Sequence, residues 1–239
     1  MSLAFFRKTA ATFPMANIEV IVKEAFAPLL EGMPSVTAIH RFEQHQLKRL
    51  SGLIRFCKGL KTDGRPYDLY LSLPDSFSSA LIGRLTRCKA RIGYRADLRS
   101  MLLTRAIRKP RHRHRVEEYC WLLKDFNPTP CVAPDVRLPV ENGRLGHFTK
   151  IRRKNHAHVV LHMNSEADSR RIPLEKAVDL ARAILERHRV RLFLTGTDQD
   201  NDYNHALTVQ LGAPETVINL SGRTGVMDLA RLFTAVDLV

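Results

Sequence analysis

Two adjacent arginines, Arg170 and Arg171, stand between a short apolar run and the start of a helical pattern. The run at 159–161 (Val-Val-Leu) is typical of a buried parallel strand. Pro173 stands where a helix would begin, a position that tolerates its missing N–H, and apolar residues then recur at helical spacing to His188. Free N–H groups at a helix N-terminus, the helix dipole and guanidinium groups all favour an anion, most naturally a phosphate. An ordinary strand-to-helix connection with solvated arginines fits the same pattern equally well.

The rest of the chain supplies elements that would position this loop. Apolar runs predict strands at 18–22, 36–39, 67–73, 91–94, 190–195, 217–220 and 236–239. Between them, helical patterns cover 3–12, 24–31, 43–61, 76–86, 200–211 and 226–234. This alternation predicts an α/β fold with parallel sheets flanked by helices. A proline-rich segment at 127–142 is the best candidate for a linker between two domains.

Charge narrows the range of partners. The 239 residues carry a net charge of +14, which favours nucleic acid, an anionic membrane surface or a phosphorylated substrate without choosing among them. Six of the eleven residues from Arg105 to Arg115 are Lys or Arg. That run lacks the interleaved aromatics of a nucleic-acid stacking platform, so a basic loop facing a membrane or a phosphorylated lipid explains it as well. No apolar run approaches the ~20 residues of a spanning helix.

The acidic run 198–202 could bind a metal ion. An EF-hand loop starting at Asp198 needs glycine at its sixth position and glutamate at its twelfth, but these positions hold Tyr203 and Val209. A D-x-D metal site remains open, although capping of the following helix by these carboxylates is favoured. The four cysteines lack C-x-x-C spacing, which indicates reduced thiols in a cytosolic protein and no structural metal. Glycine-rich dinucleotide, P-loop, serine-hydrolase and zincin motifs are absent from the sequence.

Read in order, four passages resemble glycosyltransferase family 9, the lipopolysaccharide heptosyltransferases, and most of all its heptosyltransferase II branch. Residues 13–32 (FPMANIEVIVKEAFAPLLEG) are similar to the family's second strand and helix. Residues 73–82 (LPDSFSSALI), 91–95 (RIGYR) and 102–104 (LLT) resemble its acceptor-domain segments. Residues 158–173 resemble its donor loop, and 194–200 (LTGTDQD) with 219–224 (NLSGRT) resemble its L-x-G-S-x-x-D and N-L-x-G-x-T motifs. The match extends across almost the whole chain.

The resemblance implies a GT-B architecture, with two Rossmann-like domains facing across a cleft. Residues 1–140 would form the acceptor-side domain and 155–239 the donor domain, both incomplete. The implied reaction is an inverting, metal-independent transfer of heptose from ADP-heptose to the lipopolysaccharide inner core, with no cofactor. The implied donor-binding residues are Asn164, Ser165, Arg170, Arg171, Gly196, Thr197, Asp200 and Thr224, and the acceptor-binding residues are Ser76, Ser79 and Arg95.

Departures from the family pattern affect the predicted activity. Asp75 stands where asparagine is usual, Ser165-Glu166 replaces Pro-Gly, and Ile172 replaces tryptophan. The family's G-D turn, whose aspartate would be the catalytic base, and its D-[ST]-G-x-x-H segment have no counterpart here, so no catalytic residue is assigned. We therefore expect a fragment or a degenerate member of the family. We also expect the protein to lie in the cytoplasm, or peripherally on the inner face of the cytoplasmic membrane through Arg105 to Arg115. A catalytically inactive binding protein and a basic nucleic-acid-binding protein are the alternatives.

Overall fold

The computed structural model describes residues 2–60, 66–130, 138, 140, 156–165 and 167–239. The chain divides into two compact units, Met1–Pro139 and Val140–Val239, here called unit 1 and unit 2. Most of the predicted proline-rich linker at 127–142 lies outside the described residues. The predicted domain limits, 1–140 and 155–239, and the roles given to the two domains therefore stay predictions.

The strands of unit 1 form two parallel sheets. Strand β1 (Ile18–Lys23) pairs with β2 (Val36–Phe42), while β3 (Leu69–Ser72), β4 (Ala90–Tyr94) and β5 (Arg105–Ile107) form the second sheet in that order. The family resemblance implies a first domain that lacks its first strand, and this stays a prediction. Among the described residues, no strand hydrogen-bonds to both β1 and β3. Buried side chains nevertheless join the two sheets in a single core, which includes Val20 of β1 and Ile92 of β4.

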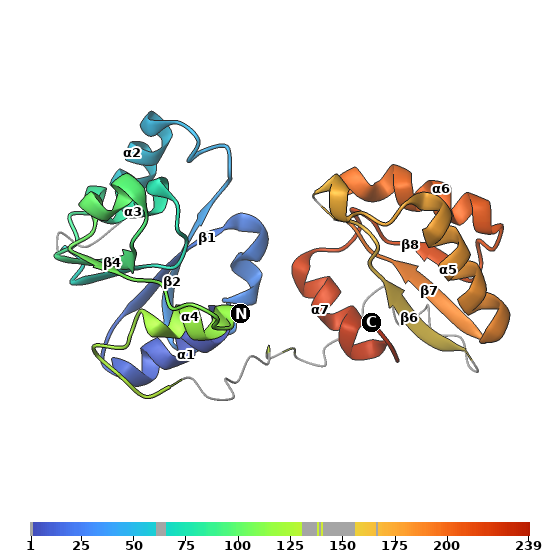
Figure 1. Cartoon of the computed structure of the whole chain (residues 1–239), viewed down its shortest axis with the longest axis horizontal. Coiled ribbons are helices and arrows are strands. Elements are labelled where there is room, and N and C mark those ends of the chain that lie inside the picture. Colours follow the sequence, from blue (N-terminus) through green and yellow to red (C-terminus); the bar gives the residue numbers. More distant parts are fainter. Residues whose placement is uncertain (1, 61–65, 131–137, 139, 141–155, 166) are drawn as a thin grey trace. The chain divides into compact units, whose positions relative to one another are not determined.

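The helices of unit 1 cover these sheets (Figure 1). They are α1 (Ser2–Thr12), α2 (Leu50–Gly59), α3 (Phe77–Leu85) and α4 (Arg115–Trp121), with 3-10 helices η1 (Glu24–Leu29) and η2 (Asp97–Leu102). Helix α1 packs against α4, and α3 packs against η2. Helix α2 is shorter than the predicted 43–61, because the Gln46 side chain accepts a hydrogen bond from the Glu43 N–H and closes a turn before it. The predicted helix at 24–31 is 3-10 and contains Pro28, which cannot donate a backbone hydrogen bond.

Unit 2 is a three-layer arrangement around one parallel sheet (Figure 1). Its strands β6 (Ala157–Leu161), β7 (Val190–Leu194) and β8 (Val217–Asn219) are ordered β6-β7-β8. Alternate side chains face opposite sides, as the period of a strand requires. Val159 and Leu192 pack with helices α5 (Leu174–Arg187) and α6 (Asn201–Leu211), whereas Val160 and Phe193 pack with α7 (Val226–Ala235). The predicted α/β fold with parallel sheets is therefore confirmed.

The last residues reach the free side of β6. The predicted strand at 236–239 is reduced to one parallel bridge between Val159 and Leu238, supported by a 2.9 Å hydrogen bond from Val160 N to Leu238 O. Because β7 lies on the other side of β6, the strand order reverses at β6. In open parallel sheets, ligands bind outside the carboxyl ends of the strands at such a reversal. The loop after β6 is therefore the first place to look for a site.

Candidate functional site

Polar residues that follow β6, β7 and β8 converge at the carboxyl end of the sheet in unit 2. Asn164 donates from Nδ2 to the Thr195 carbonyl at 3.2 Å. Asn204 of α6, only 1% exposed, donates to the same carbonyl at 3.3 Å and to Ser221 Oγ at 2.6 Å. Its Oδ1 accepts from Asn164 Nδ2 at 3.3 Å. Asn204 thus ties the three strand-end loops together, since it contacts one residue from each.

Two backbone segments approach closely at Gly196. Gly222 N donates to Gly196 O at 3.0 Å, which joins the loops after β7 and β8. A Cβ added at Gly196 would lie 2.7 Å from the Cβ of Asp200 and 3.1 Å from both Asn164 Nδ2 and Ser221 Oγ. These distances leave no room for a side chain, so glycine is required here for close packing of the three loops.

Asp200 organises the start of α6. Its Oδ2 accepts hydrogen bonds from the N–H and hydroxyl of Thr197, both at 2.8 Å, and its Oδ1 pairs with Arg171 Nη2 at 3.0 Å. Burial by itself would raise the pKa of Asp200, but the Thr197 hydrogen bonds and the Arg171 charge bring this pKa below its usual value. The acidic run 198–202 is predicted to cap the following helix. Asp200 instead completes a capping box with Thr197 in the 3-10 helix η5 (Asp198–Asp200), and it makes no side-chain cap hydrogen bond to α6. Across the described ranges, no group of three or more His, Cys, Asp or Glu side chains could hold a metal ion.

The lowered pKa of Asp200 predicts that the stability of unit 2 falls in acid. Because the folded pKa lies below the unfolded value, this carboxylate stabilises the fold above the unfolded pKa of about 4, and the contribution disappears as pH falls through the folded pKa. We expect Asp200→Asn to lower stability at pH 7 and to flatten its dependence on pH below about 4. Chemical denaturation between pH 2.5 and 7 measures this. Asp202→Asn, on the exposed side of α6, is the control. If Asp202→Asn flattened the pH dependence of stability as much as Asp200→Asn, Asp200 would not be the group responsible.

The two arginines that follow β6 occupy different environments. Arg171 is half-buried between Asp200 and the ring of Tyr203, 5.9 Å from the ring centroid, and its Nη2 lies 3.5 Å from the carbonyl of Ser165. Arg170 ends the 3-10 helix η4 (Asp168–Arg170) and is exposed. Pro173 is the N-cap of α5, so the helix begins one residue later than predicted. The charge of Arg171 is already compensated by Asp200, whereas that of Arg170 faces solvent.

The structure brings together only part of the predicted donor set. Asn164, Gly196, Thr197 and Asp200 meet through the contacts described above, with Ser165 joined to them by Arg171. Thr224 follows β8 and is half-buried, and Arg170 lies on the exposed rim. Asn164 Oδ1 is buried without a hydrogen-bond partner within the described residues, which leaves an unused acceptor at the strand ends. The role of this set in binding a donor stays a prediction.

The predicted acceptor-binding residues lie at the corresponding end of β3 and β4 in unit 1. Ser76 is the N-cap of α3, and its hydroxyl accepts from Ser79 N at 3.3 Å. Ser79 is buried, and its own hydroxyl donates to the Ser76 carbonyl at 2.7 Å. Arg95 directly follows β4 and is exposed. Ser76 thus caps α3, Ser79 is buried in its first turn, and Ser76 and Arg95 are the exposed members of the set.

The basic run from Arg105 to Arg115 differs from the predicted solvated loop. Its first three residues form β5, because they pair with β4. Four of its cations have carboxylate partners, which reduces the charge available to a membrane or nucleic acid. The pairs are Arg105 with Asp125, Lys109 with Asp75 and Glu118, Arg113 with Glu117, and Arg115 with Glu118.

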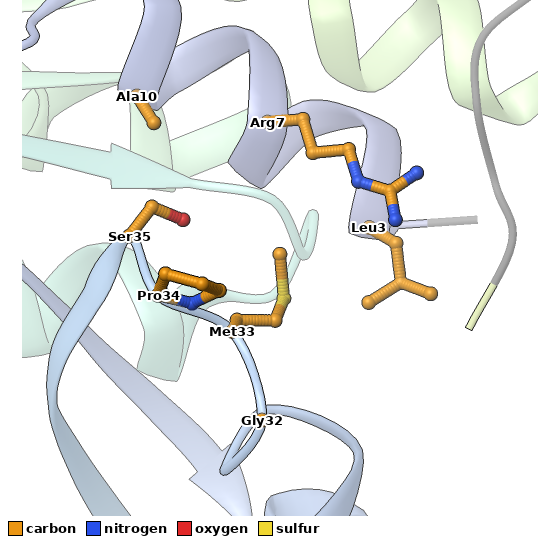
Figure 2. A pocket seen from close by; sticks show the side chains of 7 residues that line it. All are labelled: Leu3, Arg7, Ala10, Gly32, Met33, Pro34 and Ser35. Atoms are coloured by element: carbon orange, nitrogen blue, oxygen red, sulfur yellow. The ribbon is translucent and has the colours of Figure 1, made fainter. Parts of the chain in front are cut away.

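A hollow of about 250 Å³ in unit 1 holds none of the predicted site residues. It lies between α1 and the loop after η1, and Figure 2 shows the Arg7 side chain running towards Leu3 along it. Mainly apolar atoms line it, from Leu3, Arg7, Ala10, Gly32, Met33, Pro34 and Ser35. With few polar groups directed into it, the hollow does not have the chemistry of a sugar or phosphate site.

Sequence reasoning missed two buried polar residues, Asn204 and Arg99. Asn204 stands three residues before the buried Leu207, on the apolar side of α6. Arg99 lies in η2 and is 2% exposed. A polar residue at a core position of an apolar pattern could have indicated Asn204, because such a residue needs buried partners. No comparable pattern marks Arg99.

Comparison with known proteins identifies relatives for most of the chain. The model of glycosyltransferase family 9 (heptosyltransferase) matches residues 53–239. Lipooligosaccharide heptosyltransferase 2 of Haemophilus ducreyi is 33% identical over 104 residues. That alignment covers 43% of this chain and 29% of the relative's length.

Solved structures resemble the chain in fold. E. coli ADP-heptose lipopolysaccharide heptosyltransferase II superposes with a TM-score of 0.77 at 22% identity, over 99% of this chain and 73% of that one. A glycosyl transferase family 9 protein from Veillonella parvula gives 0.80 at 15% identity, over 98% and 69%. E. coli heptosyltransferase WaaC, solved with ADP, gives 0.70 at 18% identity, over 97% and 72%. Within the described part of the chain, no helix combines the length and apolar character needed to span a bilayer.

Proposed function

Because the chain belongs to glycosyltransferase family 9, the heptosyltransferases, we propose that it serves in transfer of a heptose from ADP-heptose to the lipopolysaccharide inner core. The reaction would invert the anomeric centre and need no metal ion. The observation that supports a donor site is the convergence of the loops after β6, β7 and β8 around Asn204. This convergence lies at the carboxyl end of a parallel sheet, beside the reversal of strand order at β6, where α/β proteins bind nucleotides.

The two ends of the donor would contact different parts of this cluster. The diphosphate would lie near Asn164, Ser165 and the N-terminus of α5, where free N–H groups and the helix dipole favour anions. The nucleoside would lie against Gly196 and Thr197, with Thr224 at the end of β8. Asp200 would act indirectly, since its oxygens are engaged by Thr197 and Arg171.

The chemistry requires positive charge on the departing diphosphate and a base on the acceptor hydroxyl. Arg170 is suited to the first role because it is exposed beside α5, whereas Arg171 is held by Asp200. The base is not assigned. On the acceptor side, Ser76, Ser79 and Arg95 would contact the saccharide at the carboxyl ends of β3 and β4. Arg105 to Arg115 would provide peripheral contact with the inner membrane surface from the cytoplasm.

Replacement of Arg170 by alanine should weaken ADP binding by roughly 1.5–3 kcal/mol, the contribution of a charge-assisted hydrogen bond. Arg170→Lys should recover part of this loss because the charge is kept. Calorimetry of ADP binding measures both. Arg187→Ala, at the far end of α5, removes an equal exposed charge and should change affinity little. Equal effects of Arg170→Ala and Arg187→Ala would remove Arg170 from the site.

A nucleic-acid-binding function remains the rival, and the net charge of +14 is the observation that favours it. We expect ADP to bind and a generic DNA duplex to bind weakly, since four cations of the run 105–115 are paired within the protein. Titrations with each ligand at 50 and 200 mM salt separate the two functions. Strong DNA binding with a steep dependence on salt, and no response to ADP, would support the rival instead. ADP binding without transfer in a heptose-transfer assay would indicate an inactive family member.

A further inference from the structure

An arginine side chain is buried at the carboxyl end of β3 and β4 in unit 1. Arg99 is 2% exposed and donates from Nη2 to Ser72 Oγ at 2.9 Å. Its Nε and Nη1 are buried without hydrogen-bond partners among the described residues. Nη1 lies 3.5 Å from Asp75 Oδ1, an ion pair that is too long for a good hydrogen bond. A buried guanidinium with unused donors is costly unless an anion compensates it, so this position is prepared for a negative group.

A second cation faces the same carboxylate. Lys109 Nζ lies 3.0 Å from Asp75 Oδ2 and 3.5 Å from Glu118 Oε2, and Glu118 is shared with Arg115. Asp75 thus bridges Arg99 and Lys109. It stands directly before Ser76, the N-cap of the nine-residue helix α3, whose first-turn N–H groups also favour an anion. Two cations therefore meet at one carboxylate, which is 41% exposed, and α3 begins two residues after it.

We propose that Arg99, Lys109 and the N-terminus of α3 form a phosphate-binding site that Asp75 occupies in the free protein. The Asp75 carboxylate takes the place of the ligand oxygens. A phosphate carries more charge and more acceptor oxygens than a carboxylate, so it can satisfy Nε or Nη1 of Arg99 as well as Lys109. Rotation of the half-exposed Asp75 side chain towards solvent would open the site.

The surroundings indicate that the phosphate is carried by an amphipathic ligand. Phe77 at the start of α3 is 51% exposed, and Leu98 and Met101, which flank Arg99 in η2, are 72% and 81% exposed. Helices α3 and η2 pack against each other, so exposed apolar side chains occur on both elements that adjoin the Arg99–Asp75 pair. A phosphate next to exposed apolar groups matches a lipid-linked saccharide or the lipid surface itself. Assigning it to the acceptor rests on the proposed function, whereas phosphate binding rests on the geometry alone.

The test uses the full 239-residue chain and inorganic phosphate, titrated by calorimetry at constant ionic strength. We expect Asp75→Asn to raise phosphate affinity about tenfold, because it removes a competing negative charge from the site. Asp68→Asn is the matched control. Asp68 pairs with Lys89 at 3.3 Å just before β3 and its side chain is 89% exposed, so it changes the same net charge elsewhere on unit 1. Equal affinities for Asp75→Asn and Asp68→Asn would overturn the proposal.

A second variant keeps the test independent of the buried arginine, whose replacement could prevent folding. Adding Lys109→Gln to Asp75→Asn should reverse the gain in phosphate affinity, whereas Lys89→Gln in the same background should preserve it. Thermal unfolding without phosphate verifies that each variant folds. Loss of affinity with Lys89→Gln equal to that with Lys109→Gln would contradict the site.

Vesicles separate the two sources of phosphate. The Asp75→Asn variant should bind phosphatidylcholine vesicles that contain phosphatidic acid more tightly than vesicles of phosphatidylcholine alone. Its affinity for the phosphatidic acid vesicles should also exceed its affinity for inorganic phosphate. Binding of inorganic phosphate without a vesicle preference would place the group on a soluble ligand and overturn the lipid assignment. The ADP experiment on Arg170 reports on unit 2, so failure there rejects the proposed function without affecting phosphate binding in unit 1.

Discussion

Replacement of Asn204 by leucine should lower the free energy of unfolding of unit 2 by about 2–4 kcal/mol. Leucine has the same number of side-chain heavy atoms as asparagine, with the same branching, but it is larger and can neither donate nor accept hydrogen bonds. The substitution therefore leaves the Thr195 carbonyl, Ser221 Oγ and Asn164 Nδ2 short of a partner in a buried place. Urea denaturation followed by hydrogen exchange at amides of unit 2 measures the loss.

The same substitution should also weaken ADP binding, because the loops after β6, β7 and β8 would no longer be held together. His205→Leu is the control, since it adds the same side chain at the next, exposed position of α6. A stability change for Asn204→Leu no larger than that for His205→Leu would show that Asn204 does not hold the loops.

Gly196→Ala should destabilise unit 2 by about 2–3 kcal/mol and abolish measurable ADP binding. The new methyl group would lie 2.7 Å from the Cβ of Asp200, in the same loop, and 3.1 Å from Asn164 Nδ2 and Ser221 Oγ in the loops after β6 and β8, so these groups must move away from it. Denaturation and ADP calorimetry on the same preparation measure the two effects.

Gly212→Ala provides the matched comparison. Gly212 ends α6 with φ of +62° and has nothing within 4 Å of an added Cβ. Its substitution should cost about 1 kcal/mol from the backbone conformation alone and leave ADP binding unchanged. If Gly196→Ala bound ADP like Gly212→Ala, close packing of the loops would have no role in the site.

Much of the fold of unit 2 could be predicted from local patterns. Residues 159–161 and 192–194 are continuous apolar runs, because both faces of these parallel strands are covered by helices. The start of α6 was also predictable, since the helical pattern predicts a helix from residue 200 and α6 begins at Asn201. Each of these features depends on residues close in sequence.

Features that depend on distant partners could not be predicted. The pairing of Arg171 with Asp200 joins residues 29 apart in sequence, and the contact of Arg99 with Ser72 spans 27. One carboxylate partner of the basic run 105–115 is also distant, since Asp75 lies 34 residues from Lys109. Charge counts along the chain do not distinguish a compensated cation from an available one, which is why Arg170 and Arg171 appeared equivalent in the sequence.

A two-dimensional amide NMR titration of the 15N-labelled chain with ADP tests the central claim most directly. The proposed donor site predicts the largest chemical-shift changes at Asn164, Gly196 and Thr197, at the carboxyl ends of β6 and β7. Amides of unit 1 should shift little. Changes concentrated in unit 1, or no specific change in unit 2 at saturating ADP, would contradict a nucleotide site at the carboxyl end of this sheet.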